Sequence, residues 1–176
     1  MRIDIIDDDN IEDLLYFCKQ CDLLGYENNK DLKSIRYDLV KKTGNFWGAW
    51  HNNKLIAIAG AHPLPEVKEN AFRVLFRGCQ LYSPHKTLNS CHMNSVPFGD
   101  ILPHQIKKYY DYELYTTTNV SHDASGKMHK THKVMSLLNK KDIVSYSHNM
   151  ILFNVEQSVW KINKDRYLEL RKKLRG

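Results

Sequence analysis

The chain has no apolar run near the roughly 20 residues that a membrane-spanning helix requires. Its N-terminus, MRIDIIDDDN, is acidic, so neither a secretory nor a transit peptide is predicted. Glycine and proline are scarce, at 8 and 5 residues of 176, and no linker, repeat or low-complexity tract divides the sequence. We therefore expect one domain over residues 1–176, located in the cytoplasm and not attached to a membrane.

Cysteine is also scarce, with four residues, of which Cys18 and Cys21 form a C-x-x-C pair. A structural zinc site would need a second compact pair, and Cys79 and Cys91 are spaced too widely to form one. The first pair lies in a helical pattern, LLYFCKQCDLL, among residues typical of a core. We expect buried, reduced thiols and no metal.

Charge is biased towards the basic side, with a formal net charge of +6 and a pI near 9.0. The first dozen residues are acidic, whereas the chain ends in DRYLELRKKLRG. This balance favours polyanionic partners such as nucleic acid or phosphate-bearing cofactors, without choosing between them. In the second half of the chain, tyrosines and a tryptophan are interleaved with Lys and Arg. Such a pattern suits base stacking and phosphate contacts, although the same residues also occur at the edges of ordinary cores.

Hydrophobic periodicity predicts a mixed α/β (α+β) domain. The N-terminal segment RIDIID predicts a strand, followed by helices to about Leu24 and over about 30–42. FWGAW and KLIAIAG predict a hairpin around His51-Asn52-Asn53, and AFRVLFRGCQLYS predicts a further strand. A helix is expected over ILPHQIKKYYDY, a strand over ELYTTTN, a helix from about Ala124 to Asn139, and then one or two strands and a final strand or helix.

This order of elements resembles the fold of the GCN5-related N-acetyltransferases, the GNAT family. FWGAWHNNKLIAIAG resembles the family's central hairpin, and NKKDIV lies where the family has a turn after its penultimate helix. VLFRGCQLYSP, VPFGDILPHQI and QSVWKINKDRYLELR also resemble blocks of phage-encoded GNAT-like proteins. The resemblance implies a mostly antiparallel sheet of six to seven strands flanked by about four helices. It also implies transfer of an acyl group from acetyl-CoA or a related acyl-CoA to an amine, in a cleft between the fourth and fifth strands.

Two family features have no counterpart in the sequence. The family's pyrophosphate loop, Q/R-x-x-G-x-G/A, corresponds here to HKTLNSCHMNSVPFGD, which has no glycine before Gly99. In many members of the family a Tyr of the penultimate helix acts as general acid, and Leu138 stands near its position here. Glycines matter because backbone N–H groups must approach the phosphates closely. The resemblance implies that a donor would be bound by residues after the fourth strand: Gln80, Leu81, Tyr82, Lys86, Thr87, Asn89 and Ser90.

The stretch TTTNVSHDASGKMHKTHKVM raises three alternatives. A metal site is disfavoured because its three histidines do not converge on one side of a helix. A phosphate loop is disfavoured because the first glycine of G-x-x-x-x-G-K-[ST] is missing. A catalytic site is favoured by position, because polar residues follow the end of a strand, where open α/β sheets form sites.

At that edge we expect His122 as a first general base and His132 as a second, since a histidine ordinarily titrates near neutral pH. The remaining predicted catalytic residues are Asn119 and Ser125. The alternative is that Ser125 caps the helix and His122 is a loop residue.

Arg73 and Arg77 are predicted substrate-binding residues, because a charge within a strand requires a partner or a ligand. Lys127 is predicted with them because it lies in the first turn of the helix that follows the strand ELYTTTN. We therefore carry three hypotheses: an N-acyltransferase acting on an amine-bearing small molecule, a GNAT-fold enzyme that modifies a nucleic acid or nucleotide such as DNA, and a basic binding module without catalysis.

Overall fold

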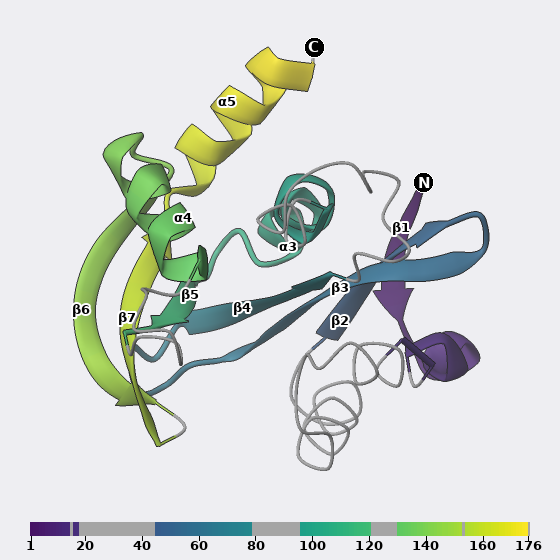
Figure 1. Ribbon diagram of the computed structural model, residues 1–176, viewed down its shortest axis with the longest axis horizontal. Coiled ribbons are helices and arrows are strands. Elements are labelled where there is room, and N and C mark those ends of the chain that lie inside the picture. The colour runs from purple at the N-terminus through teal and green to yellow at the C-terminus, as the bar shows by residue number, and fades with distance from the viewer. Residues whose placement is uncertain (15, 18–44, 79–95, 121–129, 153, 176) are drawn as a thin grey trace. The chain divides into compact units, whose positions relative to one another are not determined.

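The computed structural model describes the chain except for residues 15, 18–44, 79–95, 121–129, 153 and 176 (Figure 1). Its seven strands are β1 (Arg2–Ile6), β2 (Asn45–His51), β3 (Lys54–Pro63), β4 (Ala71–Gly78), β5 (Glu113–Asn119), β6 (Val144–Leu152) and β7 (Val155–Ile162). The described helices are η1 (Asp8–Asn10), η5 (Pro97–Ile101), α3 (Leu102–Lys108), α4 (Lys130–Lys140) and α5 (Lys164–Arg175).

The strands form one sheet in the order β1-β2-β3-β4-β5-β7-β6. β4 pairs with β5 in parallel, whereas the β1–β2, β2–β3, β5–β7 and β6–β7 pairs are antiparallel. The predicted mixed, mostly antiparallel sheet is therefore confirmed. The chain divides into two compact units, one of Met1–Pro63 with Val74–Gln105 and the other of Leu64–Arg73 with Ile106–Gly176.

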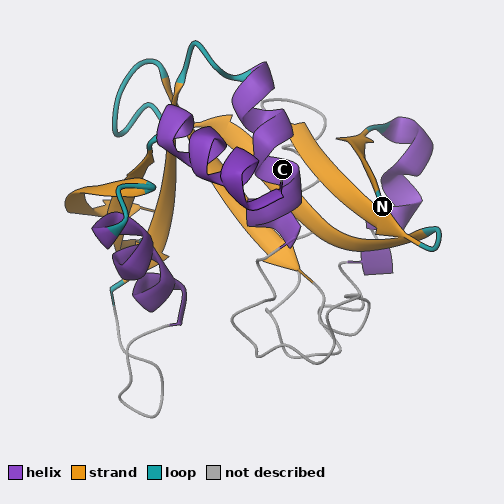
Figure 2. Ribbon diagram, turned by 90° about the horizontal axis from the view of Figure 1, so that it is seen from above, coloured by secondary structure: helices purple, strands orange, loops and turns teal. Residues whose placement is uncertain are grey.

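The first unit is built around the predicted hairpin (Figure 2). His51 pairs with Lys54, and the two residues between them, Asn52 and Asn53, have φ of 50° and 61°. Asparagine tolerates this left-handed backbone, which two-residue hairpin turns of the favoured hand require. On β3, a Cβ added to Gly60 would lie 2.6 Å from the ring of Phe46, so glycine permits the close packing of the two strands.

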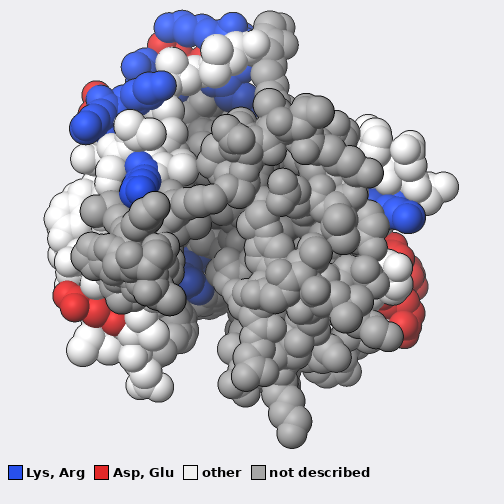
Figure 3. Space-filling view, viewed as in Figure 1, with Lys and Arg blue, Asp and Glu red and all other residues white. Residues whose placement is uncertain are grey.

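The core of this unit consists of apolar side chains from β1, the residues after η1, and the hairpin: Ile6, Leu14, Phe17, Phe46, Trp50, Leu55 and Ile58. Residues 11–14 and 16–17 are helical, in line with the first predicted helix, while the second, over about 30–42, lies outside the described residues. The acidic side chains of the N-terminal segment gather around η1 (Figure 3).

The second unit contains β5, β6, β7, α4 and α5. β5 occupies the predicted residues, Glu113–Asn119, and α4 packs on β5 and β6 (Figure 1). The helix expected over 101–112 ends earlier, at Lys108, because Tyr109–Tyr112 form a turn closed by a hydrogen bond from Tyr112 N to Tyr109 O. Pro103 lies in the first turn of α3, as predicted.

Candidate functional site

Successive side chains of β5 point to opposite faces of the sheet. Thr116 and Thr118 share one face, and both are buried. Their partners on β7 are Trp160 and Ser158, which are buried on the same face. This face therefore carries a buried row of hydroxyls beside one indole.

α4 places His132 over that row of polar side chains. The Nδ1 atom of His132 lies 3.0 Å from Oγ1 of Thr118, and the indole Nε1–H of Trp160 donates to the same oxygen at 2.8 Å. The imidazole and indole rings are also in edge contact, with centroids 5.5 Å apart. Three residues from β5, α4 and β7 thus meet at one hydroxyl, and the half-buried His132 is the only one of them that carries a general base.

The direction of one hydrogen bond at Thr118 follows from chemistry, and that of the other depends on the tautomer of His132. Trp160 Nε1 is only a donor, so Thr118 Oγ1 accepts from it. A hydroxyl oxygen has a second lone pair, with which Thr118 can accept a hydrogen bond from His132 Nδ1 in the tautomer that carries the proton there. In that tautomer Nε2 of His132 carries the lone pair that can take a proton from a substrate.

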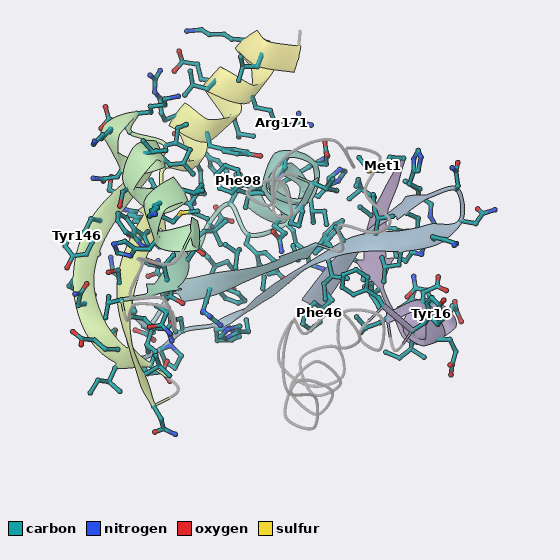
Figure 4. All side chains as sticks on the ribbon, viewed as in Figure 1. Met1, Tyr16, Phe46, Phe98, Tyr146 and Arg171 are labelled. Atoms are coloured by element: carbon teal, nitrogen blue, oxygen red, sulfur yellow. The ribbon has the colours of Figure 1, made fainter. Side chains whose placement is uncertain are left out.

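The network continues outward onto β6. The ring of Tyr146, whose side chain is exposed on β6 (Figure 4), makes an edge contact with Trp160 at 5.4 Å between centroids. The Tyr146 hydroxyl donates to Asn149 Oδ1, and the Ser158 hydroxyl donates to the same oxygen, both at 2.8 Å. These bonds fix the rim of the site at its solvent side.

The opposite face of β5 is charged and fully paired. Glu113 accepts hydrogen bonds from the hydroxyl of Tyr115 at 2.8 Å, from Lys68 at 3.1 Å and from Lys161 at 3.4 Å. The bonds from Tyr115 and Lys68 lower the pKa of the Glu113 carboxyl to about 2. Burial, and then the bond to Glu113, raise the pKa of Tyr115 to about 12. Both groups are locked in one protonation state near neutral pH, so this face is unsuited to proton transfer.

Among the predicted catalytic residues, His132 lies in the polar cluster and Asn119 ends the same strand, β5, where it pairs with Gln157. His122 and Ser125, and the substrate-binding candidate Lys127, lie outside the described residues. Their roles stay predictions.

The predicted arginines belong to β4. Arg73 Nε donates to Oγ1 of Thr117 on β5 at 2.8 Å, on the same side of the sheet as Tyr115 and away from His132. The structure does not describe the side chain of Arg77. Arg73 therefore has a partner in the protein, which weakens the argument that its charge requires a ligand.

The residues predicted to bind the acyl donor, Gln80 to Ser90, also lie outside the described part of the chain. The described turn nearest to them in sequence, the start of η5, holds Pro97, which has no N–H, and the acidic Asp100. A carboxylate in a first helical turn opposes a second anion there. The start of η5 therefore offers no favourable site for the coenzyme A pyrophosphate.

The sequence pattern missed Thr118, Ser158 and Asn149, and placed Trp160 only in a general aromatic group. The available signal was the alternation within ELYTTTN, which puts two threonines on one face of a strand. Nothing local in the sequence pairs that face with a tryptophan 42 positions away.

Among the described residues there is no cluster of three or more His, Cys, Asp or Glu side chains that could hold a metal ion. None of the helices in the described part of the chain is long and apolar enough to cross a membrane.

Solved structures with a similar fold include acetyltransferases. A chimera of the spermidine N-acetyltransferase SpeG of Vibrio cholerae with hSSAT superposes with a TM-score of 0.56 at 8% identity, covering 96% of this chain and 99% of that one. An acetyltransferase of the GNAT family from Streptococcus pneumoniae gives 0.56 at 9% identity, with coverages of 92% and 99%. The aminoglycoside acetyltransferase AAC(6')-Ib, solved with coenzyme A and kanamycin, gives 0.60 at 6% identity, with coverages of 96% and 98%.

No protein-family model and no curated protein matches the sequence. At these identities the likeness concerns the fold alone, and it agrees with the order of elements predicted from the sequence.

Proposed function

The chain has a GNAT-like fold, and from that premise we propose that it is an N-acyltransferase that moves an acyl group, such as acetyl, to the nitrogen of an amine. The observation that carries the proposal is the Trp160–Thr118–His132 cluster beside the end of β5. It supplies an oriented base to a fold whose solved examples include acetyltransferases of spermidine and of an aminoglycoside.

The base is needed because an amine is mostly protonated near neutral pH and lacks the lone pair required for attack. His132 Nε2 takes the proton from the amine nitrogen, while Nδ1 holds its own proton against Thr118. Trp160 fixes the orientation of the Thr118 hydroxyl and excludes water from one side of the imidazole.

We propose acyl-CoA as the donor because the aminoglycoside acetyltransferase of the same fold was solved with coenzyme A. When bound, the donor would supply an activated carbonyl carbon. The neutral amine would lose one further proton as its nitrogen bonds to that carbon, and coenzyme A would take up a proton and leave as the free thiol. Because the start of η5 does not suit a pyrophosphate, the first measurement is direct binding of the donor. Acetyl-CoA should raise the melting temperature of the protein if it binds the folded chain.

The decisive experiment measures release of free thiol with acetyl-CoA and a panel of polyamines and aminoglycosides, and identifies the acylated amine by mass spectrometry. We expect His132→Ala to reduce turnover by roughly a hundredfold to ten-thousandfold, the usual contribution of a general base.

His148→Ala is the matched control, because His148 is an exposed histidine on β6 bonded only to the adjacent Ser147 among the contacts described. It should leave turnover unchanged. A comparison with His122→Ala distinguishes the two predicted bases. If His132→Ala retains full turnover while His122→Ala abolishes it, His132 is not the base; if no amine is acylated, the proposed function is wrong.

A further inference from the structure

The last helix concentrates the positive charge of the chain. α5 contains six Lys or Arg residues and two acidic residues among twelve, a net +4, whereas the whole chain has a net charge of +6. Figure 3 shows Lys and Arg side chains gathered over α5 on the visible face. A charge this local is the electrostatic footprint of a polyanionic partner.

The turn after α3 is joined to α5 by direct contacts. Lys164 Nζ donates to the backbone oxygens of Tyr110 and Tyr112, the latter at 2.7 Å, and lies over the Tyr110 ring at 4.8 Å from its centroid. The Tyr110 hydroxyl donates to Asp165 at 2.9 Å. The turn and the first turn of α5 therefore form a single surface.

This α3–α5 surface presents aromatic rings beside cations. Its exposed basic and aromatic members are Lys107, Lys108, Tyr110, Tyr112, Arg166, Lys172 and Lys173, and the exposed Asp111 lies in sequence between the two tyrosines. The two tyrosine side chains are 50% and 42% exposed, which leaves ring surface available to a ligand.

The acidic side chains on α5 are already engaged. Asp165 accepts the Tyr110 hydrogen bond, and Glu169 lies between Lys173 at 2.7 Å and Arg166 at 3.6 Å. Within the described residues, Lys107, Lys108 and Lys172 form no ion pair. These three lysines are the cations best placed to bind phosphates.

We propose that the α3–α5 surface binds single-stranded nucleic acid, with its lysines contacting phosphates and Tyr110 and Tyr112 stacking on bases. A single strand is favoured over a duplex because only unpaired bases offer their faces to tyrosine rings. A membrane surface is disfavoured because Leu174 is the one large apolar side chain of α5 found exposed in the described structure. This binding goes beyond the proposed acyl transfer and does not depend on it.

The test measures the binding of fluorescently labelled oligothymidylate to the whole protein by anisotropy, over a series of salt concentrations. Each phosphate contact contributes a slope of about −0.7 to the plot of log K against log salt. The Lys107→Ala/Lys108→Ala double variant should therefore bind about tenfold more weakly at low salt and lose about 1.4 from that slope.

Lys140→Ala/Lys141→Ala is the matched control. It removes the same charge from an adjacent exposed lysine pair at the end of another helix, α4, in the same unit. We expect it to bind within twofold of wild type. If both double variants weaken binding equally, the loss of affinity depends on net charge alone, and the α3–α5 surface is not the binding site.

The tyrosines provide a second, charge-neutral test. Tyr110→Phe keeps the ring and loses only the bond to Asp165, so binding should be retained. Tyr110→Ala removes the stacking platform and should weaken binding by about tenfold. Equal binding by the two variants, or binding to anionic phosphatidylserine vesicles without binding to the oligonucleotide, would overturn the proposal.

Discussion

The two faces of β5 place similar polar residues in opposite chemical situations. On one face, Thr118 joins an indole and an imidazole without any formal charge in its contacts. On the other, Glu113 binds two lysines and a tyrosine hydroxyl. The first face carries an imidazole, whereas the second has fixed its protonation states, as the pKa of about 2 for Glu113 indicates.

The comparison shows that a charged cluster is not by itself a sign of function. Several favourable bonds to one carboxylate stabilise its charge and remove it from acid–base chemistry. We therefore propose that the neutral face serves catalysis and the charged face serves stability, and three substitutions on β5, with Thr116→Val as a control, test this division.

Thr118→Val should have the largest effect, because valine keeps the shape but leaves Trp160 Nε1 buried without an acceptor. We expect a loss of about 2 kcal/mol in the free energy of unfolding. Turnover should fall by about tenfold to a hundredfold, because His132 loses its orientation. Denaturant unfolding and steady-state kinetics measure the two effects separately.

Thr116→Val is its matched control: Thr116 is buried on the same face of β5, and no contact with His132 is described for it. We expect it to leave turnover unchanged. If both variants reduce turnover equally, Thr118 has no specific role in orienting His132.

Glu113→Gln should lower the free energy of unfolding by about 1 to 2 kcal/mol near neutral pH and leave turnover unchanged. The loss is modest because both lysines are partly exposed and solvent screens their charges. The pKa of Glu113 is lower in the folded chain, about 2, than its ordinary value of 4.5. Its contribution is therefore complete above about pH 4.5 and is lost as the pH falls towards 2.

The measurement is the difference in unfolding free energy between wild type and Glu113→Gln across that range. The difference should shrink on acidification, while turnover per folded molecule stays at the wild-type value. A loss of turnover at unchanged stability would reverse the roles assigned to the two faces.

Tyr115→Phe should have the smallest effect, below about 1 kcal/mol, because the ring stays in its apolar cluster and one hydrogen bond is lost. That bond is the largest cause of the low pKa of Glu113, so the carboxyl should titrate at higher pH in the variant. NMR titration of the side-chain carboxyl measures this shift, and an unchanged pKa would assign the low value to the lysines alone.

Much of the fold was predictable because its signals are local. The hairpin follows from two β-type runs around Asn52-Asn53, and β5 follows from ELYTTTN, which the structure places at Glu113–Asn119. The end of α3 was wrong by one turn of helix, because the contacts that hold the following turn come from Lys164, more than 50 residues later.

The candidate site was predictable only in part. His132 was expected as a second base from its place near the end of a strand, and it does lie beside β5. His122 and the residues predicted to bind the donor lie outside the described parts of the chain. The partners of His132 come from separate strands, and no spacing rule links them.

By itself, the sequence determined that β5 would show threonine hydroxyls on one face and Glu113, Tyr115 and Thr117 on the other, because a strand alternates with a period of two. Only the tertiary structure decided which face would meet a base. The pairing register sets Thr118 opposite Ser158 on β7, two positions before Trp160, and α4 then covers that face with His132. The physical reason is that alternation is a local property of the backbone, whereas register and helix packing depend on burial summed over distant segments.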